Sequence, residues 1–235
     1  MTAITGAPPV IVAERISASV PSSSGDPLVL FKDVSFSIHA GQSAAILGRS
    51  GSGKTTLLTQ LGAMNRPETG SLVLKGHELS RMGDARAARL RNEHIGFVFQ
   101  SYSLIPHLNV LENVMVPAGY STGLRRRAVR LRAKDLLEAV GLSGMESARP
   151  ARLSGGEQQR VAIARSLVLN PSIVLADEPT GALDEQTGES VLRLLLEATQ
   201  REGSCLVVVT HDEQVAARMD RVFRLGDGQL TEVAA

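Results

Sequence analysis

The sequence is poor in cysteine and in aromatic residues. Tryptophan is absent, aromatic residues make up 3% of the 235 residues, and Cys205 is the single cysteine. One cysteine excludes a disulfide framework within the chain and is consistent with a reducing compartment. Because Cys205 lies in the apolar run "SCLVVVT", we expect a small buried side chain and not a reactive thiol.

Long apolar stretches and an excess of one charge are also missing. No stretch approaches the roughly 20 apolar residues of a bilayer-crossing helix, and the N-terminal "MTAITGAPPVIVAER" lacks a basic start followed by a long apolar segment. We therefore expect a chain that is neither secreted nor membrane-spanning by itself. Lys and Arg (25) nearly balance Asp and Glu (24), so we expect no nucleic-acid partner, and any phosphate binding must be local.

Apolar runs of strand length alternate with helical segments along much of the chain, and 43% hydrophobic residues can fill a core. This alternation predicts an α/β fold with a mainly parallel sheet covered by helices on both faces. Two earlier runs flank a Ser/Pro/Gly turn, which indicates a hairpin or a small antiparallel sheet. The earlier runs are 10–16 and 28–38, and the later ones include 43–48, 95–99, 172–178 and 205–210.

Strands disappear in the middle of the sequence. There, "NVLENVMVPAG" and "LRRRAVRLRAKDLLEAVGL" have the pattern of helices, which indicates a helical subdomain inserted in the α/β core. The predicted organisation is one domain over 1–235, with a loose N-terminus at 1–9, a core at 10–100 and 156–235, and the helical subdomain at 101–155.

The strongest chemical signal is "GRSGSGKT", which fits G-x-x-x-x-G-K-[ST] between an apolar strand and a helix. The glycines let backbone N–H groups surround a phosphate, and the helix adds the positive end of its dipole. Lys54 is expected to reach the β and γ phosphates of a nucleotide, and Thr55 to offer its hydroxyl to magnesium. The predicted binding residues here are Gly48, Arg49, Ser50, Gly51, Ser52, Gly53, Lys54, Thr55 and Thr56.

Two adjacent acids follow the apolar strand in "SIVLADEPT". At the carboxyl end of a parallel strand they lie where α/β proteins bind ligands. Asp177 suits the magnesium shell, and Glu178 suits polarising the water that attacks the γ-phosphate. Taken alone, such a pair is equally an ordinary loop start.

The stretch "ARLSGGEQQRVAIARSL" places a small-residue loop before a regular helix. Ser154 with Glu157 three residues later is typical of a capping box. The amides of Ser154, Gly155 and Gly156 also form an anion site of the kind that helix N-termini provide. This site has no obvious phosphate within its own subunit.

Together these motifs resemble the ATP-binding cassette ATPases. Five elements occur in the order and approximate spacing of that family within residues 48–212: the phosphate loop, Gln100 after an apolar strand, "LSGGEQQR", "VLADEPTGALD", and His211 in "VVVTHD". The resemblance implies a P-loop NTPase core with an N-terminal antiparallel β subdomain and an inserted α-helical subdomain. It also implies ATP and Mg²⁺ as cofactors, and a head-to-tail dimer in which two copies bury two ATP molecules.

The resemblance further implies roles for single residues. Gln100 would touch magnesium and the attacking water, and His211 would reach the γ-phosphate; alone, each would be an ordinary strand-end residue. Asp184 resembles the acid of a loop that crosses the dimer interface, or is a helix N-cap. The implied catalytic residues are Lys54, Gln100, Glu178 and His211, and the metal ligands are Thr55, Gln100 and Asp177. Ser154 and Gly156 would contact the γ-phosphate in trans, and the further cofactor-binding residues are Gly155, Glu157 and Asp184.

One position departs from the family pattern. The family usually has an aromatic residue for adenine stacking a few residues past the first strand, where this chain has Val20. We expect base contacts from aliphatic side chains alone and weaker base selection, because π overlap is lost.

Residues 90–123 and "ADEPTGALDEQTGESVLRLL" resemble the macrolide-exporter and lipoprotein-release group within the family. That likeness implies a separate membrane permease, a peripheral position at the cytoplasmic face of the cell membrane, and export, extraction or mechanotransmission of lipoproteins, haem, antimicrobial peptides or drugs. A cell-division regulatory cassette that controls a wall hydrolase without transport is the alternative. The expected docking residues, or ordinary subdomain core, are Tyr102, Leu104, Ile105, Pro106 and His107.

A dense basic segment, "LRRRAVRLRAK" at 124–134, belongs to the predicted helical subdomain. Helical spacing brings Arg126, Arg130 and Lys134 onto one face. The segment is either a solvated helix face or a surface attracted to anionic lipid headgroups.

Overall fold

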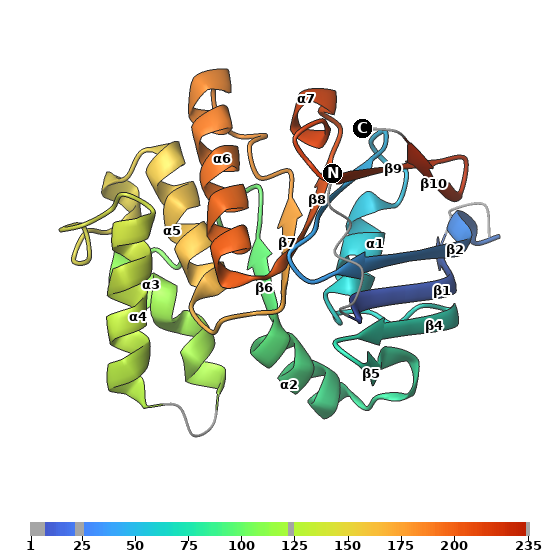
Figure 1. Cartoon of the computed structure of the whole chain (residues 1–235), viewed down its shortest axis with the longest axis horizontal. Helices are drawn as coiled ribbons and strands as arrows, with labels where there is room; N and C mark the ends of the chain where they lie inside the picture. The colour runs from blue at the N-terminus through green and yellow to red at the C-terminus, as the bar shows by residue number, and fades with distance from the viewer. Residues whose placement is uncertain (1–7, 22–25, 122–124, 234–235) are drawn as a thin grey trace. The chain divides into compact units, whose positions relative to one another are not determined.

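The computed structural model describes residues 8–21, 26–121 and 125–233. The chain divides into two compact units. Figure 1 shows the chain coloured by residue number. Unit 1 comprises Met1–Ala88 and Cys205–Ala235, and unit 2 comprises Arg89–Ser204. Most of the predicted loose N-terminus, residues 1–7, lies outside the described residues, and the predicted domain boundaries stay a prediction.

An antiparallel sheet forms the N-terminal part of unit 1. Its strand order is β2-β1-β4-β5, and every neighbouring pair is antiparallel. The predicted antiparallel β subdomain is therefore confirmed. The first strand extends beyond its apolar run, because its pairing with β2 continues, with register shifts, on both sides of Arg15. The strands are β1 (Pro9–Val20), β2 (Leu28–His39), β4 (Thr69–Leu74) and β5 (His77–Glu78).

Unit 1 also holds four strands of a second sheet, in the order β10-β9-β3-β8. The pairs β3–β8 and β3–β9 are parallel, and β9–β10 is antiparallel. Every residue of β3 and β8 is buried, as expected for parallel strands covered on both faces. The strands are β3 (Ser43–Leu47), β8 (Cys205–Thr210), β9 (Arg221–Gly226) and β10 (Gln229–Val233), with helices α1 (Lys54–Leu61) and α7 (Glu213–Ala216) and the 3₁₀ turn η1 (Leu79–Arg81).

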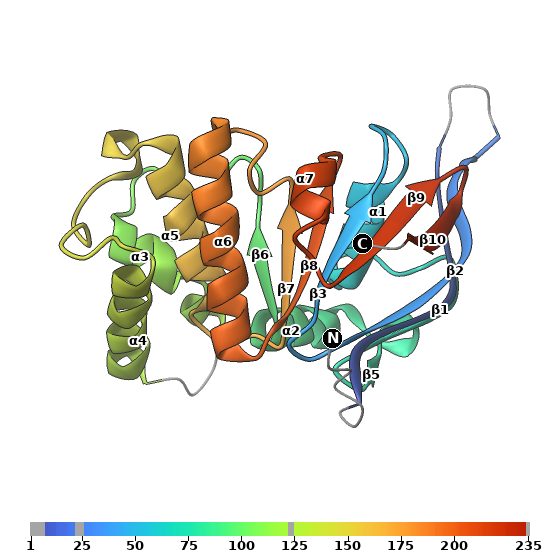
Figure 2. The same ribbon diagram turned by 45° about the horizontal axis from the view of Figure 1, so that its top comes forward.

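Unit 2 joins a parallel strand pair to a group of helices. Strands β6 (Ile95–Val98) and β7 (Ile173–Asp177) pair in parallel, and α5 packs against β6 so closely that a side chain at Gly96 would meet the Ser166 backbone. Contacts among α3, α4 and α5 confirm the inserted helical subdomain, seen in Figure 2. The helices are α3 (Val110–Met115), α4 (Arg126–Ala139), α5 (Gly155–Leu167) and α6 (Glu185–Glu202), with 3₁₀ turns η2 (Val116–Tyr120) and η3 (Pro150–Arg152). Helix α2 (Asp84–His94) continues from unit 1 into unit 2.

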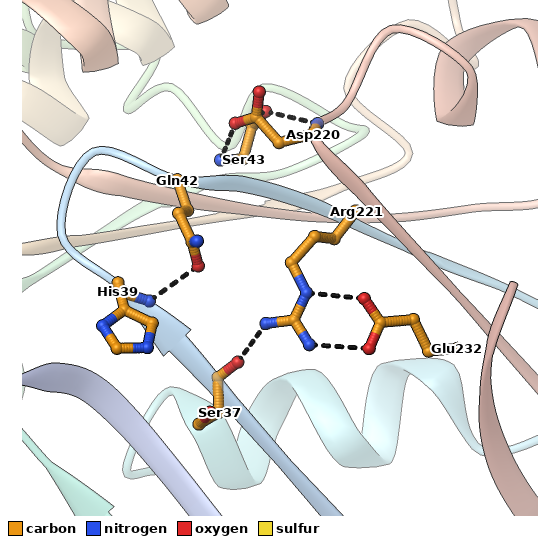
Figure 3. A network of polar contacts seen from close by, with 7 residues as sticks. All are labelled: Ser37, His39, Gln42, Ser43, Asp220, Arg221 and Glu232. Carbon is orange, nitrogen blue, oxygen red and sulfur yellow. Dashed lines mark hydrogen bonds and ion pairs between the residues drawn. The ribbon is translucent and has the colours of Figure 1, made fainter. Parts of the chain in front are cut away.

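A polar network ties the C-terminal strands of unit 1 to β2 and β3 (Figure 3). Asp220 Oδ2 accepts hydrogen bonds from the Ser43 backbone N–H and hydroxyl, both at 2.8 Å. Arg221 forms a bidentate pair with Glu232 at 2.7 and 2.8 Å and also donates to the Ser37 carbonyl. These contacts fix the start of β3, the strand from which the phosphate loop emerges.

In the described ranges we find no helix that has both the length and the apolar composition needed to cross a membrane.

Candidate active site

The phosphate loop leaves the end of β3 and turns on two glycines with left-handed backbone. Gly51 has φ 80° and Gly53 has φ 94°, a region that favours glycine. At Gly48 a side chain would lie 2.5 Å from Ser52 Oγ and 2.7 Å from the Leu225 carbonyl oxygen. The glycines are therefore required by the path of the loop.

Lys54 closes this loop. Its Nζ donates to the Gly48 carbonyl at 2.7 Å and the Arg49 carbonyl at 3.1 Å, and the residue is 9% exposed. The preceding N-cap, Gly53, gives no side-chain hydrogen bond to the first turn of α1. Because the helix N-terminus is not capped by a side chain, its amides are suited to an anion.

Ser52 adds a further observation about the same loop. Its Oγ is buried and has no hydrogen-bond partner in the described structure. A buried hydroxyl without a partner costs free energy, and a bound phosphate would supply acceptors. The loop therefore fits a phosphate group. Thr55, the second residue of α1, is exposed and directly follows Lys54 in the sequence.

His211 lies at the same sheet edge as the phosphate loop. Strands β3 and β8 are parallel neighbours with Leu47 opposite Thr210, so Gly48 and His211 are the next residues on both strands. Asp212 caps α7 by accepting from the Gln214 N–H at 2.7 Å, which fixes the chain just after His211. Unit 1 thus gathers the phosphate loop and His211.

Unit 2 gathers Gln100, Asp177 and Glu178 at a corresponding edge. Val98 of β6 pairs with Ala176 of β7, so both strands end together. A cavity of about 430 Å³ lies there, lined by Phe99, Gln100, Ser101, Asp177 and Ala182. A side chain at Gly181 would lie 2.9 Å from Gln100 Nε2 and 3.5 Å from Glu178 Cβ, so these two residues flank Gly181.

Glu178 has a strained backbone. Its φ of 45° is left-handed, which costs a non-glycine residue about 1–3 kcal/mol and is concentrated at functional sites. The turn is held by the Gly181 N–H, which donates to the Glu178 carbonyl at 3.0 Å. Gln159, fully buried on α5, donates to the Pro179 carbonyl at 2.7 Å. Sequence reasoning missed Gln159, since its role depends on a contact twenty residues away.

The capping box at the start of α5 is confirmed. Ser154 Oγ accepts from the Glu157 N–H at 3.3 Å, and Glu157 Oε2 accepts from the Ser154 N–H at 2.8 Å. The hydrogen bond from the Ser154 N–H lowers the pKa of Glu157. Ser154 is exposed, so the helix start that it caps faces solvent in the single chain.

The glycines after Ser154 are closely packed. A side chain at Gly155 would lie 2.8 Å from the Tyr102 hydroxyl, and one at Gly156 would lie 2.6 Å from Thr187 Cγ2. Asp184 is the N-cap of α6 and accepts from the Thr187 N–H at 3.0 Å, a bond that lowers the pKa of Asp184. Thr187 therefore connects Asp184 to the Ser-Gly-Gly loop.

The predicted docking segment is held by two residues that sequence reasoning missed. Tyr102 and Ser103 both have positive φ, and Arg165 of α5 donates to their carbonyls at 2.7 and 2.6 Å. Asn113, fully buried on α3, accepts from the Ile105 N–H at 2.7 Å and donates to the Ile105 carbonyl at 3.1 Å. The segment has a defined conformation, with Pro106 and His107 exposed and Tyr102, Leu104 and Ile105 partly exposed.

Val20 is half-buried at the end of β1, opposite Leu28. The aromatic residues of unit 1 are all in its core: Phe31 is 0%, Phe36 8% and Phe223 3% exposed. The loss of an aromatic side chain at Val20 is therefore not compensated by an accessible ring elsewhere in unit 1.

The comparisons with known proteins show the family to which the chain belongs. The family model for ABC transporters matches residues 31–181. The macrolide export ATP-binding/permease protein MacB of Burkholderia pseudomallei is 47% identical over 94% of this chain. This chain spans only 34% of that relative's length. The lipoprotein-releasing system ATP-binding protein LolD of Francisella tularensis is 43% identical over 86% of this chain and 88% of its own length.

Solved structures support the same assignment. The ATP-binding cassette MJ0796, in a dimeric post-hydrolysis state bound to ADP and Pi, is 35% identical with a TM-score of 0.83, over 96% of this chain and 99% of that one. A second dimeric structure of MJ0796 is 36% identical with the same TM-score. The motifs, the fold and these matches together show that the chain is an ATP-binding ATPase domain that belongs to the ABC transporter family.

Proposed function

We propose that the chain hydrolyses ATP in composite sites between two head-to-tail copies and thereby drives a separate membrane permease of the MacB type. The observation that carries this proposal is the phosphate loop, whose glycines, uncapped helix start and Lys54 form an anion site. The dimeric state of the cassette MJ0796, solved with ADP and Pi, supports the arrangement in pairs.

In this proposal the loop residues 48–56 hold the phosphates. Their backbone N–H groups and the Lys54 ammonium supply positive charge where the γ-phosphate accumulates negative charge during transfer. Lys54 already spans the loop at the Gly48 and Arg49 carbonyls, so its amine needs little movement to meet a phosphate.

Magnesium would be held by oxygen ligands from Thr55, Gln100 and Asp177. Hydroxyl, amide and carboxylate oxygens suit this hard cation, which keeps several waters and is otherwise bound by phosphate oxygens. In the described residues no cluster of three His, Cys, Asp or Glu side chains forms a metal site of its own, consistent with a cation bound mainly through the nucleotide. When bound, the ion neutralises charge on the β and γ phosphates.

Glu178 would accept a proton from, or polarise, the attacking water. Its strained turn follows the carboxyl end of β7 and places Glu178 Cβ next to Gly181, which also borders Gln100 Nε2. His211 and Gln100 would orient the water and respond to the γ-phosphate. In these roles Glu178 acts as a general base, and the positioning of the water contributes to the acceleration of hydrolysis.

The second copy would complete each site with its Ser-Gly-Gly loop. Gly155 and Gly156 present amides at the N-terminus of α5, a favourable position for an anion, next to Ser154, whose own N–H is bonded to Glu157. Because Ser154 is exposed, its loop is accessible to a phosphate held by another copy. Glu157 would fix the loop, and Asp184 would contribute to the same interface.

The membrane partner is proposed from the relatives that export macrolides or release lipoproteins. The chain would lie peripherally at the cytoplasmic face of the membrane and receive a helix of the permease at Tyr102–His107. Lipoproteins, haem, antimicrobial peptides and drugs are the candidate substrates, whose selection would rest with the permease.

Coexpression with the neighbouring genes tests the membrane proposal. A tagged chain should copurify in detergent with an integral membrane protein, and the membrane protein should stimulate its ATP turnover. Ile105→Asp should reduce copurification, whereas the control Met64→Asp, at an exposed apolar position outside the docking segment, should not. Full activity without any membrane protein, or ATP-dependent control of a wall hydrolase without transport, would contradict the transporter proposal.

A further inference from the structure

Helix α4 begins with a concentrated set of basic side chains. Six basic residues fall between positions 125 and 134. Five of them are exposed and are called the basic patch here: Arg125, Arg126, Arg127, Arg130 and Lys134. The nucleotide site and the docking segment use none of them.

Arg132, on the same helix, differs from the basic patch because its side chain is bonded within the protein. It donates to the carbonyls of Leu167 and Val168, both at 3.1 Å, and pairs with Glu202 at 2.7 Å. None of the five patch residues forms an ion pair in the described part of the chain. The exposed acids of α4, Asp135 and Glu138, lie toward its C-terminal end, with Glu138 one turn beyond Lys134, so the four arginines of the patch have no acid at i,i+3 or i,i+4 on this helix.

The patch also opposes the stability of its own helix. The first turn of α4 contains no acidic residue, and the N-cap, Arg125, gives no side-chain hydrogen bond. Positive charge near a helix N-terminus is unfavourable, and the like-charged pairs Arg126/Arg130 and Arg130/Lys134 at i,i+4 add repulsion. An anion bound outside the helix would relieve both effects.

An apolar side chain lies beside the patch. Leu131 is 56% exposed, whereas the opposite side of α4 buries Val129, Ala133 and Leu136 in the helical subdomain. Basic residues next to an exposed apolar residue are typical of helices that lie on a membrane surface, where the basic heads meet headgroups and the apolar residue enters the boundary.

We propose that the basic patch of α4 binds a surface of anionic lipid headgroups. The five residues span about 14 Å along the chain at a helical rise of 1.5 Å per residue, so several headgroups can be engaged at once. Long flexible Arg and Lys side chains on a convex helix surface are better suited to binding a fluid charged surface than to binding one small anion. The near-neutral charge of the whole chain makes the attraction local to this helix.

Vesicle flotation with the full chain tests this proposal. The probes are phosphatidylcholine vesicles with and without about 30% phosphatidylglycerol, at low and at high salt. Each basic residue near an anionic bilayer strengthens binding by about fivefold. We expect binding to the anionic vesicles only, its loss at high salt, and at least a tenfold decrease for the triple variant Arg126→Gln, Arg127→Gln, Arg130→Gln.

A matched variant removes three exposed arginines elsewhere: Arg81→Gln, Arg86→Gln and Arg89→Gln, at or near α2. It should bind anionic vesicles within about twofold of the wild type, and both variants should keep wild-type ATP turnover without vesicles. Equal binding to both vesicle types, or wild-type binding by the α4 variant, would overturn the proposal. So would full competition by inorganic phosphate, or a duplex DNA that binds in place of the vesicles.

Discussion

At the scale of single residues, the departure at Val20 has a defined place in the structure. Val20 ends β1 opposite Leu28. Two residues further along β2, Leu30 and then Phe31 lie against the Gly53 position of the phosphate loop. The strand pair that carries Val20 therefore reaches the phosphate loop, while Phe31, Phe36 and Phe223 of unit 1 are buried in its core. We therefore expect phosphate contacts to contribute more to nucleotide binding than contacts to the base.

We predict that Val20→Tyr tightens ATP binding by fivefold or more, since stacking of a base on an aromatic ring contributes about 1–3 kcal/mol. Titrations with ATP, GTP and tripolyphosphate measure this, and the wild type should distinguish them weakly. Val12→Tyr is the matched control, because Val12 is half-buried on the same strand, about 26 Å away at 3.3 Å per residue. A wild type that strongly prefers ATP, with no gain in Val20→Tyr, would contradict this account.

Cys205 gives a second prediction at the residue scale. Its thiol is fully buried at the start of β8, and burial raises its pKa to about 12. Thiolate is the reactive form, so we expect iodoacetamide to leave native Cys205 unmodified at neutral pH and to modify it in urea. Mass spectrometry of the intact chain measures both states, and rapid modification of the folded chain would contradict the prediction.

At the scale of elements, local patterns identified most of the structure and part of the site. The phosphate loop, the strands before it and the Ser154 capping box depend on neighbours within a few positions, so the sequence predicts them. Gln159, Arg165 and Asn113 act on segments that folding brings close, and a polar residue inside a helix gives no signal of such a contact. Strands β9 and β10 were also missed, because their apolar positions are mixed with charged residues.

Asn113 of α3 holds the adjoining docking segment through its side chain. Its side chain makes four hydrogen bonds to backbone groups of the segment between Ile105 and Asn109. Asn113→Ala should lower the free energy of unfolding by about 1–3 kcal/mol, because the Ile105 N–H loses its partner. Urea denaturation measures the change, and exposed Asn65→Ala should alter it by less than about 0.5 kcal/mol. Equal effects of the two variants would contradict a stabilising role for the hydrogen bonds of Asn113.

At the scale of the whole molecule, hydrogen-bonded carboxylates link stability to pH. The pKa values of Glu68, Glu157, Asp184 and Glu232 are lowered, for Glu232 chiefly by the hydrogen bond from Arg221. A lowered pKa means that the unfolded chain binds protons first as the pH falls. These groups therefore stabilise the fold fully at neutral pH and lose that contribution as the pH falls below the ordinary value of 4.5, or 3.8 for Asp184.

We predict that the free energy of unfolding, followed by urea denaturation between pH 7 and pH 3, decreases as the pH falls below about 4.5. Glu232→Gln should lower stability at neutral pH and flatten the acid slope, since the pair with Arg221 in Figure 3 is lost. Glu197→Gln removes the same charge at an exposed position of α6 and should leave the slope unchanged. An unchanged slope in Glu232→Gln would argue against the linkage.

A composite site needs the phosphate loop of one copy and the Ser-Gly-Gly loop of the other, so mixing two inactive variants shows whether such a site forms. Lys54→Ala disables the phosphate loop, and Ser154→Asp keeps a good N-cap residue while placing a negative charge against the γ-phosphate. A head-to-tail heterodimer of the two contains one intact site, so an equal mixture should recover up to about a quarter of wild-type ATP turnover. Both variants must show wild-type thermal unfolding. No recovery in the mixture, or near-normal turnover by Ser154→Asp alone, would contradict the composite site.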